Sequence, residues 1–292
     1  MDSLLKLGKN TYVLQCDSNV GFYQYNENNI CLIDTGSSKQ EVNKIIEILE
    51  YNQWNLTTIV NTHSHADHIA GNKILQEKYG CRIYSNINEI PFINNTLLTS
   101  ALFYGSNPIS DLKNPFLMGE NSNCYNINKL YIPGIKTIEL FGHSIGSIGV
   151  LTSDDVLFVG DAYTSIENLK RYSLQYVFDV GKYLKSLSFL KCQNFSYYVA
   201  SHDIVREEIA DVIKENIDNC NIIIKNILEL INDGITYDSL IKGIFKKYNI
   251  KMNVNQYFLI SSNLKAYLTF LYENSVITFE FKNNDFIIKK LS

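Results

Sequence analysis

Four side chains that commonly bind metal ions lie close together in this sequence: His63, His65, Asp67 and His68. They follow residues 57–60, a β-branched run typical of a strand. Imidazole and carboxylate groups suit zinc and related divalent ions. In an extended segment alternate residues point the same way, so His63, His65 and Asp67 can converge while His68 turns toward a neighbouring position. Because a tetrahedral catalytic site takes three protein ligands, four ligands here plus distant partners indicate two ions.

The other candidate ligands lie far along the chain but share one position, at the end of a segment predicted to be a strand. They are His143 after residues 135–141, Asp161 after residues 156–159 and His202 after residues 197–200. The sequence contains five histidines, so every histidine belongs to one of these sets. Residues 142–147 read Gly-His-Ser-Ile-Gly-Ser, and their glycines allow close backbone approach around the histidine.

The elements before the first cluster predict a β-meander followed by a helix. Strand-like segments at residues 11–16, 20–25 and 29–35 are separated by turn-forming Asp, Asn and Ser residues. A helix is predicted over residues 39–51. Asp34 ends the last strand just before that helix, and two roles are open for it: support of the metal-binding loop, or a turn carboxylate at the helix start.

The segments after the first cluster predict a rigid frame for it. Apolar residues at helical spacing predict a helix over residues 69–79 that Gly80 ends, and residues 81–85 predict a strand. The ligands therefore lie in a loop at the carboxyl end of a strand, where catalytic groups commonly lie. Residues 89–133 differ, because they contain the four prolines and many Asn and Ser residues. They indicate an insertion near the site, either a lid or pocket wall or an ordinary surface excursion.

The sequence beyond His202 predicts a second unit. Before it, residues 149–152 and 156–159 predict a hairpin and residues 180–191 a helix. After it come three predicted helices and two predicted strands, at residues 206–230, 237–248, 254–272, 276–281 and 286–291. The helix, helix, helix, hairpin order suggests a small winged helix. We expect two domains, residues 1–204 and residues 205–292.

The composition is ordinary for a globular protein. Of 292 residues, 46% are hydrophobic and 19% are charged, with a formal net charge of −4. No window approaches the ~20 apolar residues of a membrane span, and the N-terminus lacks the basic leader and apolar core of a signal peptide. The six cysteines form no C-x-x-C pair and indicate reduced packing residues. We expect a cytoplasmic protein with no global attraction to nucleic acid or to membranes.

Residues 7–204 resemble the metallo-β-lactamase-fold hydrolases, whose motifs occur here in the same order. The resemblance implies an α+β fold, a four-layer αββα sandwich of two mixed β-sheets with helices outside. It also implies the ligand sets: His63, His65 and His143 for one ion, Asp67, His68 and His202 for the other, and Asp161 bridging both. In that family the aspartate at the position of Asp34 supports the metal loop.

Differences between this sequence and particular branches of the superfamily make some functions less expected. Flavodiiron relatives carry Glu at the position of His65 and add a flavin-binding domain, so electron transfer is disfavoured. Nucleases of the superfamily insert a domain between the equivalents of Asp161 and His202, whereas here only some forty residues separate them. Ile145 replaces a proline that is usual in the His143 motif, a change expected to alter loop rigidity more than ligation.

The C-terminal order resembles, more weakly, the winged-helix unit that some β-lactamase-like hydrolases carry. From Arg206 onward the chain has 11 basic and 11 acidic side chains. A domain that reads nucleic acid usually shows a clear basic excess. We therefore favour a packing or dimerisation role, which leaves a homodimer open, over nucleic-acid binding.

The expected chemistry follows from two neighbouring cations. They lower the pKa of a bridging water from about 15.7 toward about 7 and so supply a hydroxide nucleophile. Asp67 and Asp161 would bind metal and orient this water. Tyr163, two residues beyond Asp161, could donate a hydrogen bond to the substrate, although a packing role is favoured for it because the chain has 20 tyrosines.

The expected function is a dinuclear metal-dependent hydrolase of a small thioester or ester, similar to glyoxalase II. The alternatives are a nuclease, phosphodiesterase or lactonase on the same metal centre, and a non-catalytic protein on an inherited fold. The expected substrate is a small molecule. Zinc is the expected ion, and iron or manganese would accept the same ligands.

Overall fold

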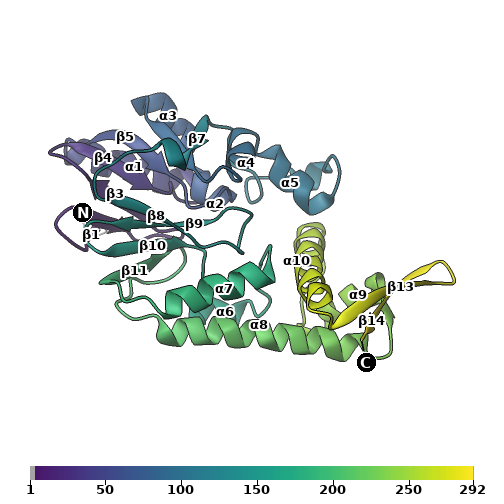
Figure 1. Ribbon diagram of the computed structural model, residues 1–292. Coiled ribbons are helices and arrows are strands. Elements are labelled where there is room, and N and C mark those ends of the chain that lie inside the picture. The colour runs from purple at the N-terminus through teal and green to yellow at the C-terminus, as the bar shows by residue number, and fades with distance from the viewer. Residues whose placement is uncertain (1–3, 292) are drawn as a thin grey trace.

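The computed structural model describes residues 4–291, whose strands form three sheets with helices packed around them (Figure 1). The first sheet has the strand order β1-β2-β3-β4-β5-β6-β7. Its strands are β1 (Leu4–Lys6), β2 (Thr11–Leu14), β3 (Val20–Gln24), β4 (Asn29–Ile33), β5 (Asn55–Val60), β6 (Arg82–Ser85) and β7 (Cys124–Asn126). Strands β1 to β4 are antiparallel, which confirms the predicted meander, and β4 to β7 are parallel.

The second sheet has the order β11-β10-β9-β8. Its strands are β8 (Ile135–Glu139), β9 (Ile148–Thr152), β10 (Val156–Gly160) and β11 (Tyr197–Ala200). Strands β8, β9 and β10 are antiparallel, whereas β10 and β11 run parallel. The crossover between β10 and β11 carries α6 (Ile166–Arg171) and α7 (Val180–Lys191), of which the sequence predicts α7 with the same bounds.

The two sheets face each other, with helices on their outer faces (Figure 1). One apolar cluster joins Cys31 and Val60 of the first sheet to Phe158 of the second. The outer face of the first sheet packs against α1 (Lys39–Tyr51), which contributes Val42 to a second cluster. The outer face of the second sheet packs against α7. The predicted arrangement of two mixed sheets between helices is therefore confirmed.

The helix predicted over residues 69–79 is interrupted. The structure has α2 (Ala66–Ile69) and then α3 (Asn72–Tyr79), with Gly71 between them. A Cβ at Gly71 would lie 3.0 Å from the backbone oxygen of Thr35, so the chain is pressed against the end of β4 there. The short helix α2 begins inside the predicted metal loop and contains Asp67 and His68.

Residues 89–133 form more than a surface excursion. They contribute β7 to the edge of the first sheet and also contain α4 (Ile90–Asn94), α5 (Leu97–Tyr104) and the 3₁₀ turns η1 (Ser110–Leu112) and η2 (Ile127–Lys129). A small apolar cluster of Phe103, Leu112 and Leu117 lies within this segment. It also packs against Leu259 from the C-terminal part of the chain, so the insertion joins distant elements.

The C-terminal helices occur in the predicted order. They are α8 (Ala210–Ile231), α9 (Tyr237–Lys247) and α10 (Val254–Glu273), and the third sheet, of order β12-β14-β13, contains β12 (Ile235–Thr236), β13 (Ile277–Lys282) and β14 (Asp285–Lys290). Helix α8 begins later than predicted, because the backbone of Arg206 pairs with that of Tyr198 and the Arg206 guanidinium binds Asp203.

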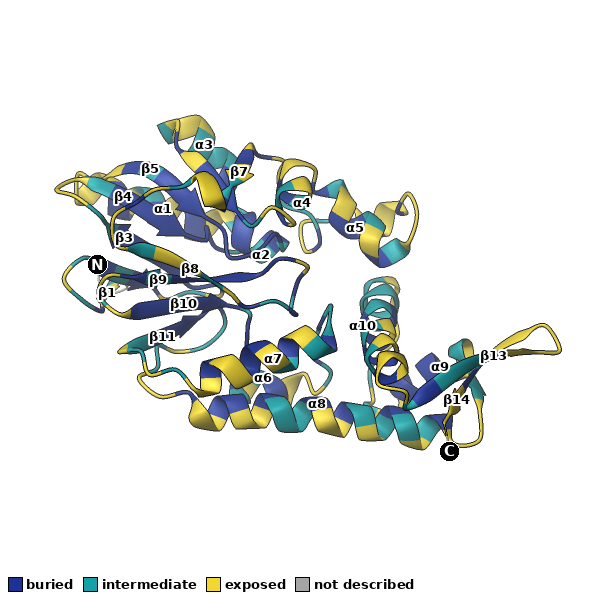
Figure 2. Ribbon diagram, viewed as in Figure 1, coloured by how far each residue is buried: buried dark blue, intermediate teal, exposed yellow. Residues whose placement is uncertain are grey.

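Helix α8 runs from beneath the second sheet to the third sheet, while α10 stands beside α5 (Figure 1). The buried face of α8, which includes Val212, Ile223 and Ile227, is dark blue in Figure 2 and its outer face is yellow or teal. One apolar cluster includes Leu157 of β10 and Ile288 of β14 as well as this helix. The core is therefore continuous, and the domain boundary after residue 204 stays a prediction. Within residues 4–291, no helix is long and apolar enough to cross a membrane.

Candidate metal centre

The seven candidate ligands meet at one edge of the two sheets, where strands β5, β8, β10 and β11 end. They form two groups whose possible ligand atoms lie within 4.8 Å of one another: His63, His65 and His143 in the first, and Asp67, His68, Asp161 and His202 in the second. The grouping matches the sets implied by the family resemblance. Residues distant in sequence converge here because the two sheets face each other and bring these strand ends to a common edge.

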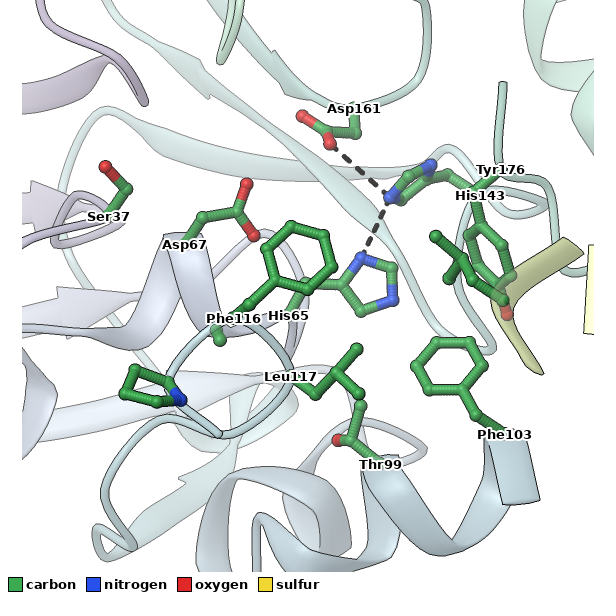
Figure 3. A pocket seen from close by; sticks show the side chains of 13 residues that line it. Ser37, His65, Asp67, Thr99, Phe103, Phe116, Leu117, His143, Asp161 and Tyr176 are labelled. Atoms are coloured by element: carbon green, nitrogen blue, oxygen red, sulfur yellow. Dashed lines mark hydrogen bonds and ion pairs between the residues drawn. The ribbon is translucent and has the colours of Figure 1, made fainter. Parts of the chain in front are cut away.

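In the first group, ring nitrogens face one another. The Nε2 atom of His143 lies 3.0 Å from Nδ1 of His65 and 3.4 Å from Oδ2 of Asp161 (Figure 3). The Nε2 atom of His63 is buried and has no hydrogen-bond partner. A buried nitrogen without a partner is costly in a finished core, so this atom fits a metal ligand.

In the second group, carboxylates lie between histidines. The Nε2 atom of His202 is 3.0 Å from Oδ2 of Asp67. The Nε2 atom of His68 is buried, has no hydrogen-bond partner, and lies 3.5 Å from Oδ1 of Asp161. Asp161 is thus near histidines of both groups, the position that a bridging ligand needs. The residues present fit two divalent ions.

The protonation preferences differ between the groups. Burial lowers the pKa of His65 to about 3, aided by nearby His143, and burial also holds the pKa of His63 well below its usual value. Neutral rings of this kind are ready to donate a lone pair to a metal. Burial also lowers the pKa of His202, but Asp161 and the hydrogen bond to Asp67 outweigh it and raise that pKa to about 9.

Asp34 ties the metal loop to the end of β4. Its carboxylate accepts hydrogen bonds from the Thr62 backbone N–H at 2.8 Å and the Thr62 hydroxyl at 2.7 Å, and its Oδ2 lies 2.9 Å from His68 Nδ1. The last contact orients the ring so that His68 Nε2 points to the second group. Of the two roles left open by the sequence, the structure places Asp34 in the supporting one. Asp34 adopts a φ of 60°, a left-handed conformation that Asp tolerates.

A second tether, Glu89, is absent from the sequence-based set. Its side chain is fully buried, and one oxygen accepts from the backbone N–H and hydroxyl of Ser64 while the other accepts from the Ser144 hydroxyl at 2.7 Å and the Gly146 N–H at 2.6 Å. Glu89 therefore joins the loop of His63 and His65 to the loop of His143. The available signal was that both histidine loops carry a serine directly beside a ligand.

Glycines next to two ligands permit close approach of the backbone. Gly142 has a φ of 126°, and a Cβ there would lie 2.2 Å from the backbone nitrogen of Tyr183. Gly160 has a φ of 56°, and a Cβ there would lie 2.8 Å from the Thr62 hydroxyl oxygen. Larger residues at these positions would push His143 or Asp161 away from the site.

The site opens into a cavity of about 300 Å³ (Figure 3). His65, Asp67, His143 and Asp161 form its floor. The remaining lining is mainly apolar: Ala66, Phe103, Pro115, Phe116, Leu117, Tyr176 and Leu259, with Ser37 and Thr99. Residues of the 89–133 insertion thus form a wall of the cavity, one of the two alternatives that the sequence left open.

Tyr163 has the packing role that the sequence favours for it, and it makes no substrate contact of the kind that the sequence left open. It is buried in the core that includes α7 and α8, and its hydroxyl has no hydrogen-bond partner. It does not line the cavity. The strand end that delivers Asp161 turns the following residues into the protein, and the tyrosine at the cavity is Tyr176 instead. The Tyr176 ring lies 5.8 Å from the His65 ring and 6.0 Å from the His143 ring, centroid to centroid.

Curated relatives match part of the chain. A hydroxyacylglutathione hydrolase from Rhizobium etli is 31% identical over 121 residues, which are 40% of this chain and 38% of that protein. One from Rhizobium meliloti is 27% identical over 141 residues, which are 42% of this chain and 55% of that protein. The matches thus span roughly two fifths to a little over half of these relatives' length.

Solved structures match nearly the whole chain. A beta-lactamase domain protein from Burkholderia ambifaria has a TM-score of 0.73 at 15% identity, covering 99% of this chain and 93% of that one. A metallo-beta-lactamase family protein from Thermus thermophilus has a TM-score of 0.68 at 16% identity, covering 99% of both. Identities this low show the fold alone. A family model described as Metallo-beta-lactamase superfamily matches residues 13–202, well over half of the chain, and contains all seven candidate ligands. The chain therefore belongs to the metallo-beta-lactamase superfamily, the family that its metal-site motifs resemble.

Proposed function

We propose that this chain is a dinuclear metal-dependent hydrolase acting on a small thioester or ester. The observation that carries the proposal is the position of Asp161. Its carboxylate lies 3.4 Å from His143 Nε2 of one group and 3.5 Å from His68 Nε2 of the other. The same residue lines the cavity, where a substrate would meet both groups.

Some of the chain's residues would bind the metal ions, and others would also orient the attacking water. The first ion would be held by His63, His65 and His143, the second by Asp67, His68 and His202, and both by Asp161. Bound ions of this kind lower the pKa of water and polarise a carbonyl oxygen. Asp67 and Asp161 would also orient the attacking water, and the apolar wall would limit access of bulk water.

Zinc is the ion that we propose. The ligands are imidazole and carboxylate groups, and no described cysteine belongs to either group. Zinc, iron and manganese all accept such ligands, and zinc binds them more tightly than the other two as divalent ions. Iron or manganese remains the alternative that element analysis would reveal.

The thioester or ester class is supported by the partial similarity to hydroxyacylglutathione hydrolases. A lactone presents the same carbonyl chemistry and is the nearest alternative. A nuclease or phosphodiesterase is less well supported, because the cavity lining includes no lysine or arginine among the described residues.

The C-terminal charges also disfavour a nuclease. Lys225, Lys247 and Lys290 gather around Glu229, which forms an ion pair with Lys247 at 2.6 Å. Lys289 lies 3.7 Å from Glu280. Acidic side chains thus lie beside both lysine doublets of the C-terminal part, Lys246–Lys247 and Lys289–Lys290. For residues 205–292 we therefore propose a winged-helix-like unit that packs against the catalytic part, with a homodimer as the further option to be tested by light scattering.

Element analysis combined with hydrolysis assays tests the function. Purified protein reconstituted with zinc, iron or manganese is analysed for metal content and then assayed on a thioester, a lactone and a phosphodiester. The expected result is up to two ions per chain and turnover of the thioester. Metal at trace level after reconstitution would refute the metal centre, and turnover of the phosphodiester alone would replace the proposed substrate class.

A further inference from the structure

The cavity above the metal centre has a polar floor and an apolar wall. The floor carries two carboxylates, Asp67 and Asp161, and the described lining residues include no lysine or arginine. Apart from bound metal, an anionic group inside this cavity would therefore find the hydroxyls of Ser37 and Thr99 but no lysine or arginine among the described lining residues. A carboxylate or phosphate away from the metals would lose its hydration without gaining a cationic partner, which is unfavourable.

The apolar wall is built by three separate segments. Phe103 comes from α5, Leu117 follows η1, and Leu259 comes from α10. The ring of Phe103 lies 5.4 Å from the ring of Tyr176, centroid to centroid. Because Phe103 and Leu117 are each 7% exposed, they form a firm surface for a hydrocarbon group.

We propose that the cavity binds an uncharged, apolar acyl group and that Phe103 sets the length of acyl chain that it accepts. The proposal rests on the proposed hydrolase function for the chemical step, but it concerns which substrate fits. The scissile carbonyl lies on the polar floor, and the hydrocarbon part of the acyl group extends along Leu117 and Leu259 toward Phe103. Anionic acyl groups such as succinyl are excluded because the wall offers them no cation.

Phe103 stands between the cavity and a second hollow. It also lines a groove of about 690 Å³ between α5, α7 and α10, whose lining includes the apolar Phe178, Ala266 and Phe270 and the charged Asp179, Lys185, Lys265 and Glu273. Phe103 is therefore shared by the metal cavity and the groove. Removal of this ring joins the two spaces and makes room for longer chains.

A binding series tests the cavity without relying on turnover. Zinc-loaded protein is titrated by calorimetry with straight-chain monocarboxylates from butanoate to dodecanoate and with dicarboxylates of matched length. We expect affinity to rise about fourfold for each added methylene until the chain reaches Phe103, from the usual value of apolar burial. The dicarboxylates should bind at least tenfold more weakly than the matched monocarboxylates. Equal affinity of the two series, or no dependence on chain length, would overturn the proposal.

A hydrolysis series on one thiol carrier separates this proposal from the proposed function. Acetyl, butanoyl, hexanoyl, octanoyl and succinyl thioesters of N-acetylcysteamine are compared by kcat/KM. The expected order rises with neutral chain length, with succinyl lowest. A preference for the acetyl or succinyl thioester would reject the proposal that the cavity binds an apolar acyl group, but it would leave the proposed hydrolase function in place. The expected binding series without any turnover would reject the hydrolase function and leave the cavity assignment in place.

Substitutions at Phe103 test the length limit. Phe103→Ala should move the preferred chain to longer members of both series, and Phe103→Leu, which keeps more of the packing, should move it less. Phe281→Ala is the matched control, because Phe281 is 81% exposed on the C-terminal hairpin. If both Phe103 variants fold and keep the wild-type chain-length preference, Phe103 does not set the limit.

Discussion

The floor and the wall of the cavity are held in different ways. On the floor, the ligand loops are fixed by charge-assisted hydrogen bonds, with Asp34 bound to Thr62 and Glu89 bound to two loops at once. The wall is held by apolar contacts among Phe103, Leu117 and the partly buried side chains around them. Directional bonds fix atoms to within a fraction of an ångström, whereas apolar contacts fix a shape. The difference suits a floor that performs chemistry and a wall that selects a substrate.

The largest effect is expected at the floor, from Asp161→Ala. The change removes the carboxylate near both histidine groups and leaves two cations without a shared counter-charge. Hydrolysis should be abolished, and retention of both ions should weaken. Element analysis after dialysis and steady-state assays measure the two losses. Asp285→Ala, on the exposed C-terminal hairpin, is the control. Full metal content together with normal turnover in Asp161→Ala would contradict the bridging role.

Glu89→Gln tests whether a residue that only holds the ligand loops in place affects metal binding. The amide has one acceptor oxygen, so its NH₂ group would face two donors from one of the two histidine loops. Loss of such a partner typically lowers metal affinity about 10- to 100-fold. Competition with a chelator gives the affinity, and the visible spectrum of cobalt-substituted protein reports the ligand geometry.

The control for this variant is Glu120→Gln, an exposed carboxylate paired with Lys73 at 3.1 Å. Its metal affinity should equal that of the wild type. If Glu89→Gln lowers only the melting temperature and leaves both the metal affinity and the cobalt spectrum unchanged, Glu89 serves general stability and does not position the ligands.

Proton release is the next effect expected at the floor. Burial lowers the pKa of His68, but Asp67, Asp161 and Asp34 outweigh it and hold that pKa well above its usual value; that of His202 is about 9. At pH 7 both rings therefore carry a proton in the metal-free protein, and a metal must displace these protons. Affinity should fall as pH falls below about 9, roughly tenfold per pH unit for each displaced proton. Calorimetry in buffers of different ionisation enthalpy gives the number of protons released on metal binding. Release of no protons at pH 7 would contradict the prediction that His68 and His202 are protonated in the metal-free protein.

The sequence predicts the floor far better than the wall. The floor residues are chemically distinctive and each follows a predicted strand, and the family resemblance then assigns them to two ions, for example His202 with Asp67 and His68. Glu89 is missed because nothing in the sequence distinguishes it from the other acids of residues 89–133, and the serines beside His63 and His143 do not name their partner. The sequence does not predict Phe103 and Leu259 as cavity-lining residues, because apolar residues are common throughout the chain. Whether these two side chains lie at the same cavity depends on how α5 and α10 pack.

Helix positions show the same limit. The bounds of α1 and α7 match the prediction, since each has a regular apolar face and a Ser or Asp cap. The helix predicted over residues 69–79 breaks at Gly71 because of contact with Thr35, a residue distant in sequence. A substrate contact for Tyr163 was likewise raised only by its proximity to Asp161 along the chain, whereas tertiary packing turns this side chain into the core. Contacts between residues distant in sequence thus determine where this helix breaks and where this side chain points, and local sequence patterns do not reveal either.

The smallest effect is expected at the wall, from Leu259→Ala. Leu259 belongs to α10, so this change asks whether the C-terminal part of the chain contributes to substrate selection. The side chain is partly exposed, and only part of its surface would contact a bound acyl group. We therefore expect KM for an apolar thioester to rise about threefold to tenfold. This is at or below the roughly tenfold lower limit of the discrimination that a closed pocket shows for one missing methylene.

The split between kinetic constants distinguishes the wall from the floor. Binding of the hydrocarbon group is the same before and during the chemical step, so kcat should change little in Leu259→Ala. Leu5→Ala, on the exposed edge strand β1, is the control with the same side-chain truncation. An unchanged KM would separate α10 from substrate binding. A large fall in kcat with unchanged KM would mean that the wall also positions the floor, and the contrast between the two regions would no longer hold.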